Sequence, residues 1–147
     1  MDGFFMKKMI SNVIICLSIV STVWIINLIT DYNKITKELI RFHVVANSDT
    51  EQDQSAKLMV RDAVLNSIQG DLAALADADA AKKYLLENLN KIQGIANQVL
   101  IEVGLEENAV VTLCQEAFEC RAYGLFSLPA GVYETLKIVI GNGEGQD

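Results

Sequence analysis

Residues 39–62 decide the fold, and they read Leu39-Ile-Arg-Phe-His-Val-Val-Ala-Asn-Ser-Asp-Thr-Glu-Gln-Asp-Gln-Ser-Ala-Lys-Leu-Met-Val-Arg-Asp62. The first part, from Leu39 to Ala46, is a run of apolar and β-branched residues that is typical of a strand. After it the apolar residues change to helical spacing, i, i+3, i+4 and i+7. They are Ala56, Met59, Val60, Ala63, Val64 and Ser67. The stretch therefore predicts a strand, a short corner and a helix.

The corner between the strand and the helix is polar. Asn47, Ser48 and Asp49 are residues that favour turns. Ser48 and Glu51 have the spacing of a capping box, in which each side chain bonds a backbone N–H group of the first helical turn. We therefore expect Ser48 to be the N-cap of the helix.

An uncharged segment, Met9 to Ile29, precedes this stretch, between Lys8 and Asp31. A helix of about 20 residues spans a bilayer core, so the segment is long enough for one crossing. Its length and the lack of a small-x-small site favour an uncleaved signal-anchor over a cleaved signal peptide, although cleavage stays open. We predict an anchor over residues 1–30, a polar stalk over residues 31–38 and an exported domain over residues 39–147.

The chain beyond the first helix continues with helical and then strand patterns. We expect that helix to end at Gly70, and Asp77 or Asp79 to cap a second one that runs to Gly104, with Asn90 able to split it. Later elements are a strand over residues 109–118, a less regular stretch over residues 121–128, a turn at residues 129–131 and a final strand containing Val132, Leu136, Ile138 and Ile140. The order strand, two or three helices, then two strands predicts an α+β domain with its helices packed on one face of the sheet.

Charge and cysteine content exclude several classes of protein. With 12 basic and 19 acidic residues the net charge is −7, and no cluster of Lys or Arg suggests a nucleic-acid surface. The three cysteines do not have zinc spacing. Six residues of straight strand span about 20 Å, so Cys114 and Cys120 can pair only if the chain bends between them. Cys16, inside the apolar segment, is expected to fill apolar space.

The corner and its strand suggest two kinds of chemical site. His43 is the only histidine, and Ser48 and Asp49 are near it in sequence, which raises the alternative of a membrane-anchored serine hydrolase. Ser48 is better explained as a helix cap, so we expect a structural or partner-facing His43. An EF-hand-like start at the corner fails, because Gln52 stands at the glycine position and Leu58 at the glutamate position. The Gly141-x-Gly143-x-Gly145 run has no helix after it to bind phosphate and is expected to be a flexible exit. No metal or cofactor is predicted.

Three segments resemble the stage II sporulation protein R family. The first is Arg41-Phe-His-Val-Val-Ala-Asn-Ser-Asp49 with Lys57-Leu-Met-Val-Arg-Asp62, and the second is Leu128-Pro-Ala-Gly-Val-Tyr-Glu-Thr-Leu-Lys-Ile-Val-Ile-Gly141. The third is the glycine-rich Gly141-Asn-Gly-Glu-Gly-Gln146. The resemblance covers about residues 39–146. The family commonly continues into an aromatic stretch with cysteines, so this chain, which stops at Asp147, is expected to be a fragment or a member without that extension.

The resemblance implies a signalling protein of endospore formation and not an enzyme. Such proteins are made in the forespore and exported into the space between two membranes. There they activate a membrane-embedded aspartic-type protease that processes the precursor of a sporulation sigma factor, pro-sigma-E. The implied partners are this protease and the membrane, with no nucleic acid and no small-molecule substrate. A cell-wall binding module held by the same anchor is a further alternative.

The strand, corner and helix carry more polar and charged side chains than folding requires. We predict that some of them contact the receptor protease. The candidates are Arg41, His43, Asn47, Asp49, Lys57, Arg61 and Asp62. Arg41 and His43 are two residues apart and share a face of the strand, whereas Lys57 and Arg61 are four apart and share a face of the helix.

Overall fold

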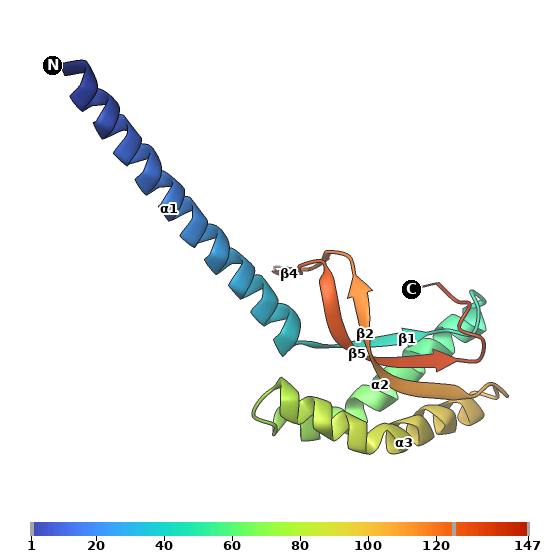
Figure 1. Cartoon of the computed structure of the whole chain (residues 1–147). Coiled ribbons are helices and arrows are strands. Elements are labelled where there is room, and N and C mark those ends of the chain that lie inside the picture. The colour runs from blue at the N-terminus through green and yellow to red at the C-terminus, as the bar shows by residue number, and fades with distance from the viewer. Residues whose placement is uncertain (1, 125, 147) are drawn as a thin grey trace. The chain divides into compact units, whose positions relative to one another are not determined.

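The computed structural model describes residues 2–124 and 126–146. Its elements, drawn in Figure 1, are α1 (Asp2–Glu38), β1 (Ile40–Val45), α2 (Glu51–Ala73), α3 (Ala78–Glu102), β2 (Ala109–Phe118), β3 (Arg121–Tyr123), β4 (Phe126–Leu128) and β5 (Gly131–Ile140). They confirm the α+β class and the predicted order of elements. The chain divides into two compact units, Met1–Thr36 and Lys37–Asp147.

Helix α1 contains the predicted apolar anchor. Over Phe4–Asp31 it is long and apolar enough to cross a membrane. Four of its hydroxyl groups, those of Ser18, Ser21, Thr22 and Thr30, donate to backbone carbonyls one turn earlier in the helix, as Ser18 Oγ does to Ile15 at 2.8 Å. These four hydroxyl groups are thereby satisfied without water, as an apolar surrounding requires. The helical conformation continues through the residues assigned to the stalk.

The main sheet has the order β1-β5-β2. β1 runs parallel to β5, with His43 opposite Lys137, and β2 runs antiparallel to β5. β5 is therefore the central strand, although it comes last in the chain. The less regular residues before it form a separate hairpin of β3 and β4 that turns at Gly124, where φ is +60°.

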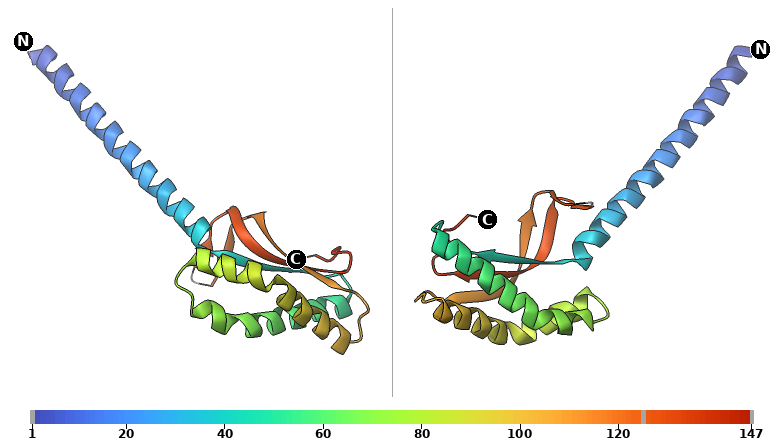
Figure 2. Two further views of the ribbon diagram at one scale, coloured as in Figure 1. Left: turned by 60° about the horizontal axis from the view of Figure 1, so that its bottom comes forward. Right: turned by 180° about the vertical axis from the view of Figure 1, so that it is seen from behind.

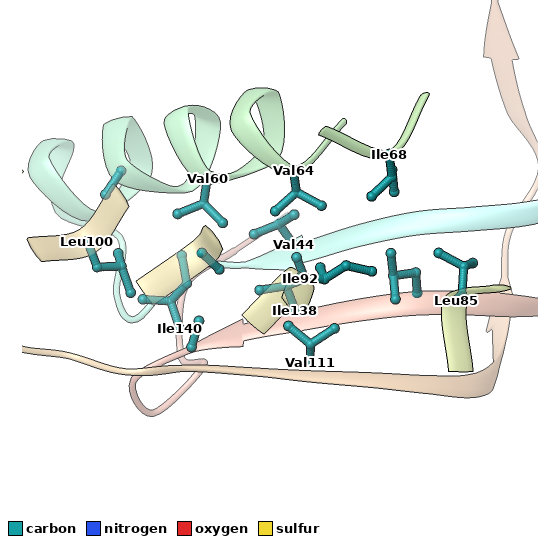
Figure 3. Packing of buried hydrophobic residues seen from close by; sticks show 14 residues of the cluster. Val44, Val60, Val64, Ile68, Leu85, Ile92, Leu100, Val111, Ile138 and Ile140 are labelled. Atoms are coloured by element: carbon teal, nitrogen blue, oxygen red, sulfur yellow. The ribbon is translucent and has the colours of Figure 1, made fainter. Parts of the chain in front are cut away.

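Helices α2 and α3 lie together on one side of this sheet, as Figure 2 shows. The core lies between them and alternate residues of the strands, because successive strand residues point to opposite faces. Figure 3 shows its main members: Val44, Val60, Val64, Ile68, Leu85, Ile92, Leu100, Val111, Ile138 and Ile140. The arrangement confirms the prediction of helices on one sheet face. The buried stripe of α2 is narrower than its sequence pattern, since Met59 is 49% exposed.

One predicted helix boundary is wrong. α2 continues through Gly70 to Ala73, since Ile68 and Leu72 on either side of this glycine pack into the core. Of the two alternatives for the later helical stretch, the structure has the continuous helix: α3 runs unbroken through Asn90, with buried residues on both sides of it, Leu85 before and Ile92 after. The start of α3 is as predicted, with the Asp77 carboxylate accepting the Ala80 N–H at 2.8 Å.

Candidate functional site

The corner (residues 46–50) is capped differently from the sequence prediction. Thr50, not Ser48, is the N-cap of α2, and its hydroxyl accepts the Asp53 N–H at 3.3 Å. Ser48 Oγ instead donates to the Asp53 carboxylate at 2.5 Å. The predicted box of Ser48 and Glu51 is therefore wrong, because a buried carboxylate on the first helical turn attracts the Ser48 hydroxyl more strongly than a backbone group does.

Asp53 is the polar centre of the corner. Its side chain is buried, and it accepts hydrogen bonds from Ser48 Oγ and from Asn47 Nδ2, the latter at 3.1 Å. The bond from Ser48 is the largest cause that lowers the pKa of Asp53, and it outweighs the effect of burial. The carboxylate therefore stays charged at neutral pH and holds Asn47 and Ser48 in place.

The glycine segment (residues 141–146) packs along the corner, so the prediction of a flexible exit is wrong. Backbone N–H groups of Glu144 and Gly145 donate to the carbonyls of Asn47 and Ala46 at 3.1 and 3.0 Å. Asn47 Oδ1 accepts the Asn142 N–H at 3.0 Å, and Asp49 Oδ1 accepts the Gln146 N–H at 2.6 Å. The end of the domain is thus hydrogen-bonded to residues that lie about a hundred positions earlier in the chain.

Glycine is required in this segment for two physical reasons. Gly141 has φ +57°, and a side chain there would meet the Asn47 carboxamide. At Gly145 a Cβ atom would lie 2.8 Å from the Ser48 carbonyl oxygen and 2.8 Å from the Ala46 side chain. The glycine-rich composition that suggested flexibility therefore serves close contact with the corner.

The seven predicted contact residues fall into separate places. Asn47 and Asp49 hold the glycine segment, which gives both a structural role. Asp62 pairs with Arg61 at 2.9 Å on the surface of α2. The remaining four, Arg41, His43, Lys57 and Arg61, line one pocket of about 220 Å³ beside β1.

This basic pocket also contains residues that the sequence did not indicate. Phe118, at the end of β2, and Arg121, at the start of β3, complete its wall together with Phe42, Val44 and Leu58. The Arg41 guanidinium lies 3.7 Å from the centre of the Phe118 ring, close enough for a cation–π contact. No local sequence signal links Phe118 or Arg121 to β1, because the pairing of β2 with β5 brings them there.

A charged network stands beside the pocket on the sheet face opposite the helices. Glu116 on β2 bonds His43 Nδ1 at 2.7 Å and Lys137 Nζ at 2.6 Å. Burial alone would raise the pKa of Glu116, but the bonds from Lys137 and His43 lower it below its usual value. The ring of His43 also meets Phe118 edge to face, with 5.8 Å between ring centres. These contacts hold His43 and Phe118 in fixed positions at the pocket wall.

The residues of the alternative hydrolase have three different partners. His43 bonds Glu116, Ser48 bonds Asp53, and Asp49 bonds the backbone of Gln146. Each of the three side chains therefore has a structural partner outside a Ser-His-Asp proton relay. Within residues 2–124 and 126–146 no three His, Cys, Asp or Glu side chains are grouped to bind a metal ion. Cys16, Cys114 and Cys120 are free thiols.

A larger pocket of about 400 Å³ opens between the C-terminal end of α2, the N-terminal end of α3 and the start of β1. Its walls are mostly apolar, with Ile68, Leu72 and Leu85 among them, and its charged lining residues are Glu38, Arg41 and Asp77. The Asp77 carboxylate in its lining caps α3. This pocket offers few groups for recognition, so we take the basic pocket as the candidate site.

The family match covers the domain and not the apolar part of α1. Residues 36–147 match the model of the family described as stage II sporulation protein R. Over 111 residues the sequence is 32% identical to stage II sporulation protein R of Bacillus subtilis (strain 168), an overlap that includes 76% of this chain and 50% of that protein. The chain therefore spans about half the length of that relative. No solved structure matches the chain.

Proposed function

The chain belongs to the stage II sporulation protein R family, and on that premise we propose that it is an exported signalling protein of endospore formation. It activates a membrane-embedded aspartic-type protease, which then processes the precursor of a sporulation sigma factor. The observation that carries this proposal is the family match over residues 36–147, which coincides with the compact unit Lys37–Asp147. The signal is delivered by binding and needs no chemistry from this chain.

The apolar part of α1 supports the proposed location. A helix that can cross a membrane retains the domain at the surface of the forespore membrane, in the space between the two cells, where it meets the receptor. Short diffusion distances and retention raise the effective concentration of the signal for a receptor in the opposite membrane.

The basic pocket supports the proposed mode of recognition. Arg41, Lys57, Arg61 and Arg121 project from three elements around one cavity, whereas the whole chain has a net charge of −7. A local positive surface on an acidic protein attracts a negatively charged partner surface and repels positively charged ones, which favours specific docking. The guanidinium groups suit bidentate contact with carboxylates.

Protease added to intact protoplasts that make the chain tests the location. We expect digestion of the domain from outside, because export places residues 39–147 beyond the membrane. A cytoplasmic marker protein serves as the control for leakage. Complete protection of the domain in intact cells, with digestion only after lysis, contradicts the proposed topology.

Co-expression in a non-sporulating host tests the function. The chain, the membrane protease and the sigma-factor precursor are produced together, and processing is followed as a change in precursor size. We expect processing only when the chain is present and exported. Deleting the span Phe4–Asp31 keeps the domain in the cytoplasm and should abolish processing. Processing without the chain, or none with the full set, overturns the proposal.

Single substitutions in the same assay test the docking surface. Under the proposal, at least one of Arg41→Ala, His43→Ala and Arg61→Ala leaves the domain folded by circular dichroism but reduces processing. Lys91→Ala, which removes an exposed lysine of α3 outside the pocket, is the matched control. Full activity of all three folded variants moves the receptor surface to the strands after Gly104.

A further inference from the structure

The two edges of the main sheet differ in how they are protected. α3 covers the first part of the β2 edge, since Gln93 Oε1 accepts the Val111 N–H at 3.2 Å and Asn97 Oδ1 accepts the Ala109 N–H at 2.6 Å. β1 lies at the other edge and pairs on one side with β5. Among the described residues no further strand lies beyond β1. An edge strand directs every second N–H and C=O group outward and is a template for another strand.

The basic pocket runs along this same edge of β1. Its lining takes Phe42 and Val44 from the helix-facing side of the strand and Arg41 and His43 from the opposite side. The pocket therefore includes the strand edge and not only one face of the sheet. Four of its nine lining residues are Lys or Arg, and none is Asp or Glu.

Together these features fit a partner of one kind. We infer that the β1 edge binds an extended acidic peptide segment, which adds to the sheet as a fourth strand. The inference rests on the proposed function, in which the segment belongs to the extracytoplasmic part of the receptor protease. Backbone hydrogen bonds to β1 supply affinity, and side-chain contacts in the pocket supply specificity, as in other cases of strand addition.

The positions of the basic residues define the peptide further. Consecutive side chains of an added strand point to opposite faces. One face meets Lys57 and Arg61 on α2, and the other meets Arg121 together with the Phe118 ring. Two adjacent acidic residues, flanked by β-branched residues that favour a strand, place one carboxylate on each face.

Two of these basic side chains already have polar contacts that a carboxylate of the peptide can replace. Lys57 Nζ donates to the Gln146 carbonyl at 3.0 Å, and Arg61 pairs with Asp62 at 2.9 Å at the surface. An exposed ion pair such as Arg61–Asp62 contributes about 0–1 kcal/mol, so a carboxylate of the peptide can replace Asp62 at small cost.

The test uses the full chain in phosphatidylcholine nanodiscs and a fluorescein-labelled peptide, Thr-Val-Glu-Glu-Val-Thr-Val, with binding followed by fluorescence polarisation. Two matched peptides serve as controls: one has Gln-Gln in place of Glu-Glu, and one is N-methylated at its central residues, which removes the N–H donors but keeps the charge. We expect saturable binding of the first peptide and a loss of about tenfold or more in affinity, about 1.4 kcal/mol, with each control.

Charge-reversal variants of the protein complete the design. Arg61→Glu and Arg121→Glu alter exposed side chains and should each weaken the acidic peptide about tenfold, whereas Lys91→Glu, an equal charge change outside the pocket, should leave the affinity within about twofold. Equal binding of the N-methylated peptide shows a purely electrostatic contact and overturns strand addition. Absence of peptide binding, or binding of phosphatidylglycerol vesicles in place of the peptide, also overturns it.

The processing assay separates the two proposals. If the unmodified chain triggers processing and Arg61→Glu and Arg121→Glu do so equally well, the pocket inference fails while the proposed function stands. If the unmodified chain triggers no processing, the proposed function fails whatever the peptide does.

Discussion

Replacing Asn47 by alanine tests how the end of the domain is held. The Asn47 side chain accepts the Asn142 N–H at 3.0 Å and donates to the Asp53 carboxylate at 3.1 Å. It thus connects the glycine segment to the polar centre of the corner. In Asn47→Ala both bonds are lost, while the backbone bond from Glu144 to the Asn47 carbonyl can remain.

The size of the effect follows from the two bonds. A neutral hydrogen bond contributes about 0.5–1.5 kcal/mol and one to a charged group about 1.5–3 kcal/mol. Asn47 is only half-buried, so water replaces part of the loss, and we expect a decrease of about 1.5–3 kcal/mol in the free energy of unfolding. For a domain the size of Lys37–Asp147, about 1 kcal/mol lowers the melting midpoint by about 4 °C. The midpoint should therefore fall by about 6–12 °C.

Thermal unfolding of the full chain in neutral detergent, followed by circular dichroism, measures this change. Amide hydrogen exchange over residues 141–146 should rise in Asn47→Ala, because the glycine segment opens first. Asn142→Ala is the matched control, since it keeps the backbone N–H that bonds Asn47 and should change little. An unaltered midpoint together with unaltered exchange in residues 141–146 would refute the reasoning.

Three further results are expected. Gly145→Ala forces a methyl group against the corner and should lower the free energy of unfolding by about 1–3 kcal/mol, whereas Gly70→Ala, in an open part of α2, should raise it by about 0.5–1 kcal/mol. Chemical denaturation measures both changes, and an equal effect of the two substitutions would contradict the packing of the glycine segment. Ile92→Ala, at a fully buried position of α3, should cost about 2–5 kcal/mol in the same measurement, and a loss below about 1 kcal/mol would show a looser core. Asp53 and Glu116 have lowered pKa values in the folded protein, so the unfolded chain binds more protons in acid and stability should fall as the pH drops below about 4. The urea midpoint, measured from neutral pH to below about pH 4, follows this loss of stability, and Asp53→Asn should make the loss smaller. A midpoint that does not change with pH would exclude both carboxylates as its cause.

The sequence by itself determined the elements that have a strong local signal. The β-branched run before the corner, the helical spacing after it and the Asp77 cap gave β1, α2 and the start of α3. Strand β2 was also predicted, and its bounds Ala109–Phe118 agree with the structure. Such signals act between residues a few positions apart, through backbone sterics and side-chain caps.

The helix cap and the glycine segment show where local reasoning fails. Ser48 has the spacing of a cap, but the burial of Asp53 gives its hydroxyl a stronger partner, and burial depends on the packing of the whole domain. Glycines 141, 143 and 145 suggest flexibility when read alone. Their role depends on the corner, which is close in space and far away in sequence.

Only the tertiary structure decided which predicted contact residues lie together. Arg41, His43, Lys57 and Arg61 line one pocket, whereas Asn47 and Asp49 stabilise the corner. The pocket also needs Phe118 and Arg121, which reach β1 because the last strand of the chain, β5, inserts between β1 and β2. Strand order is set by the burial of apolar faces against α2 and α3, and this pairing between distant segments leaves no mark in the local pattern of residues.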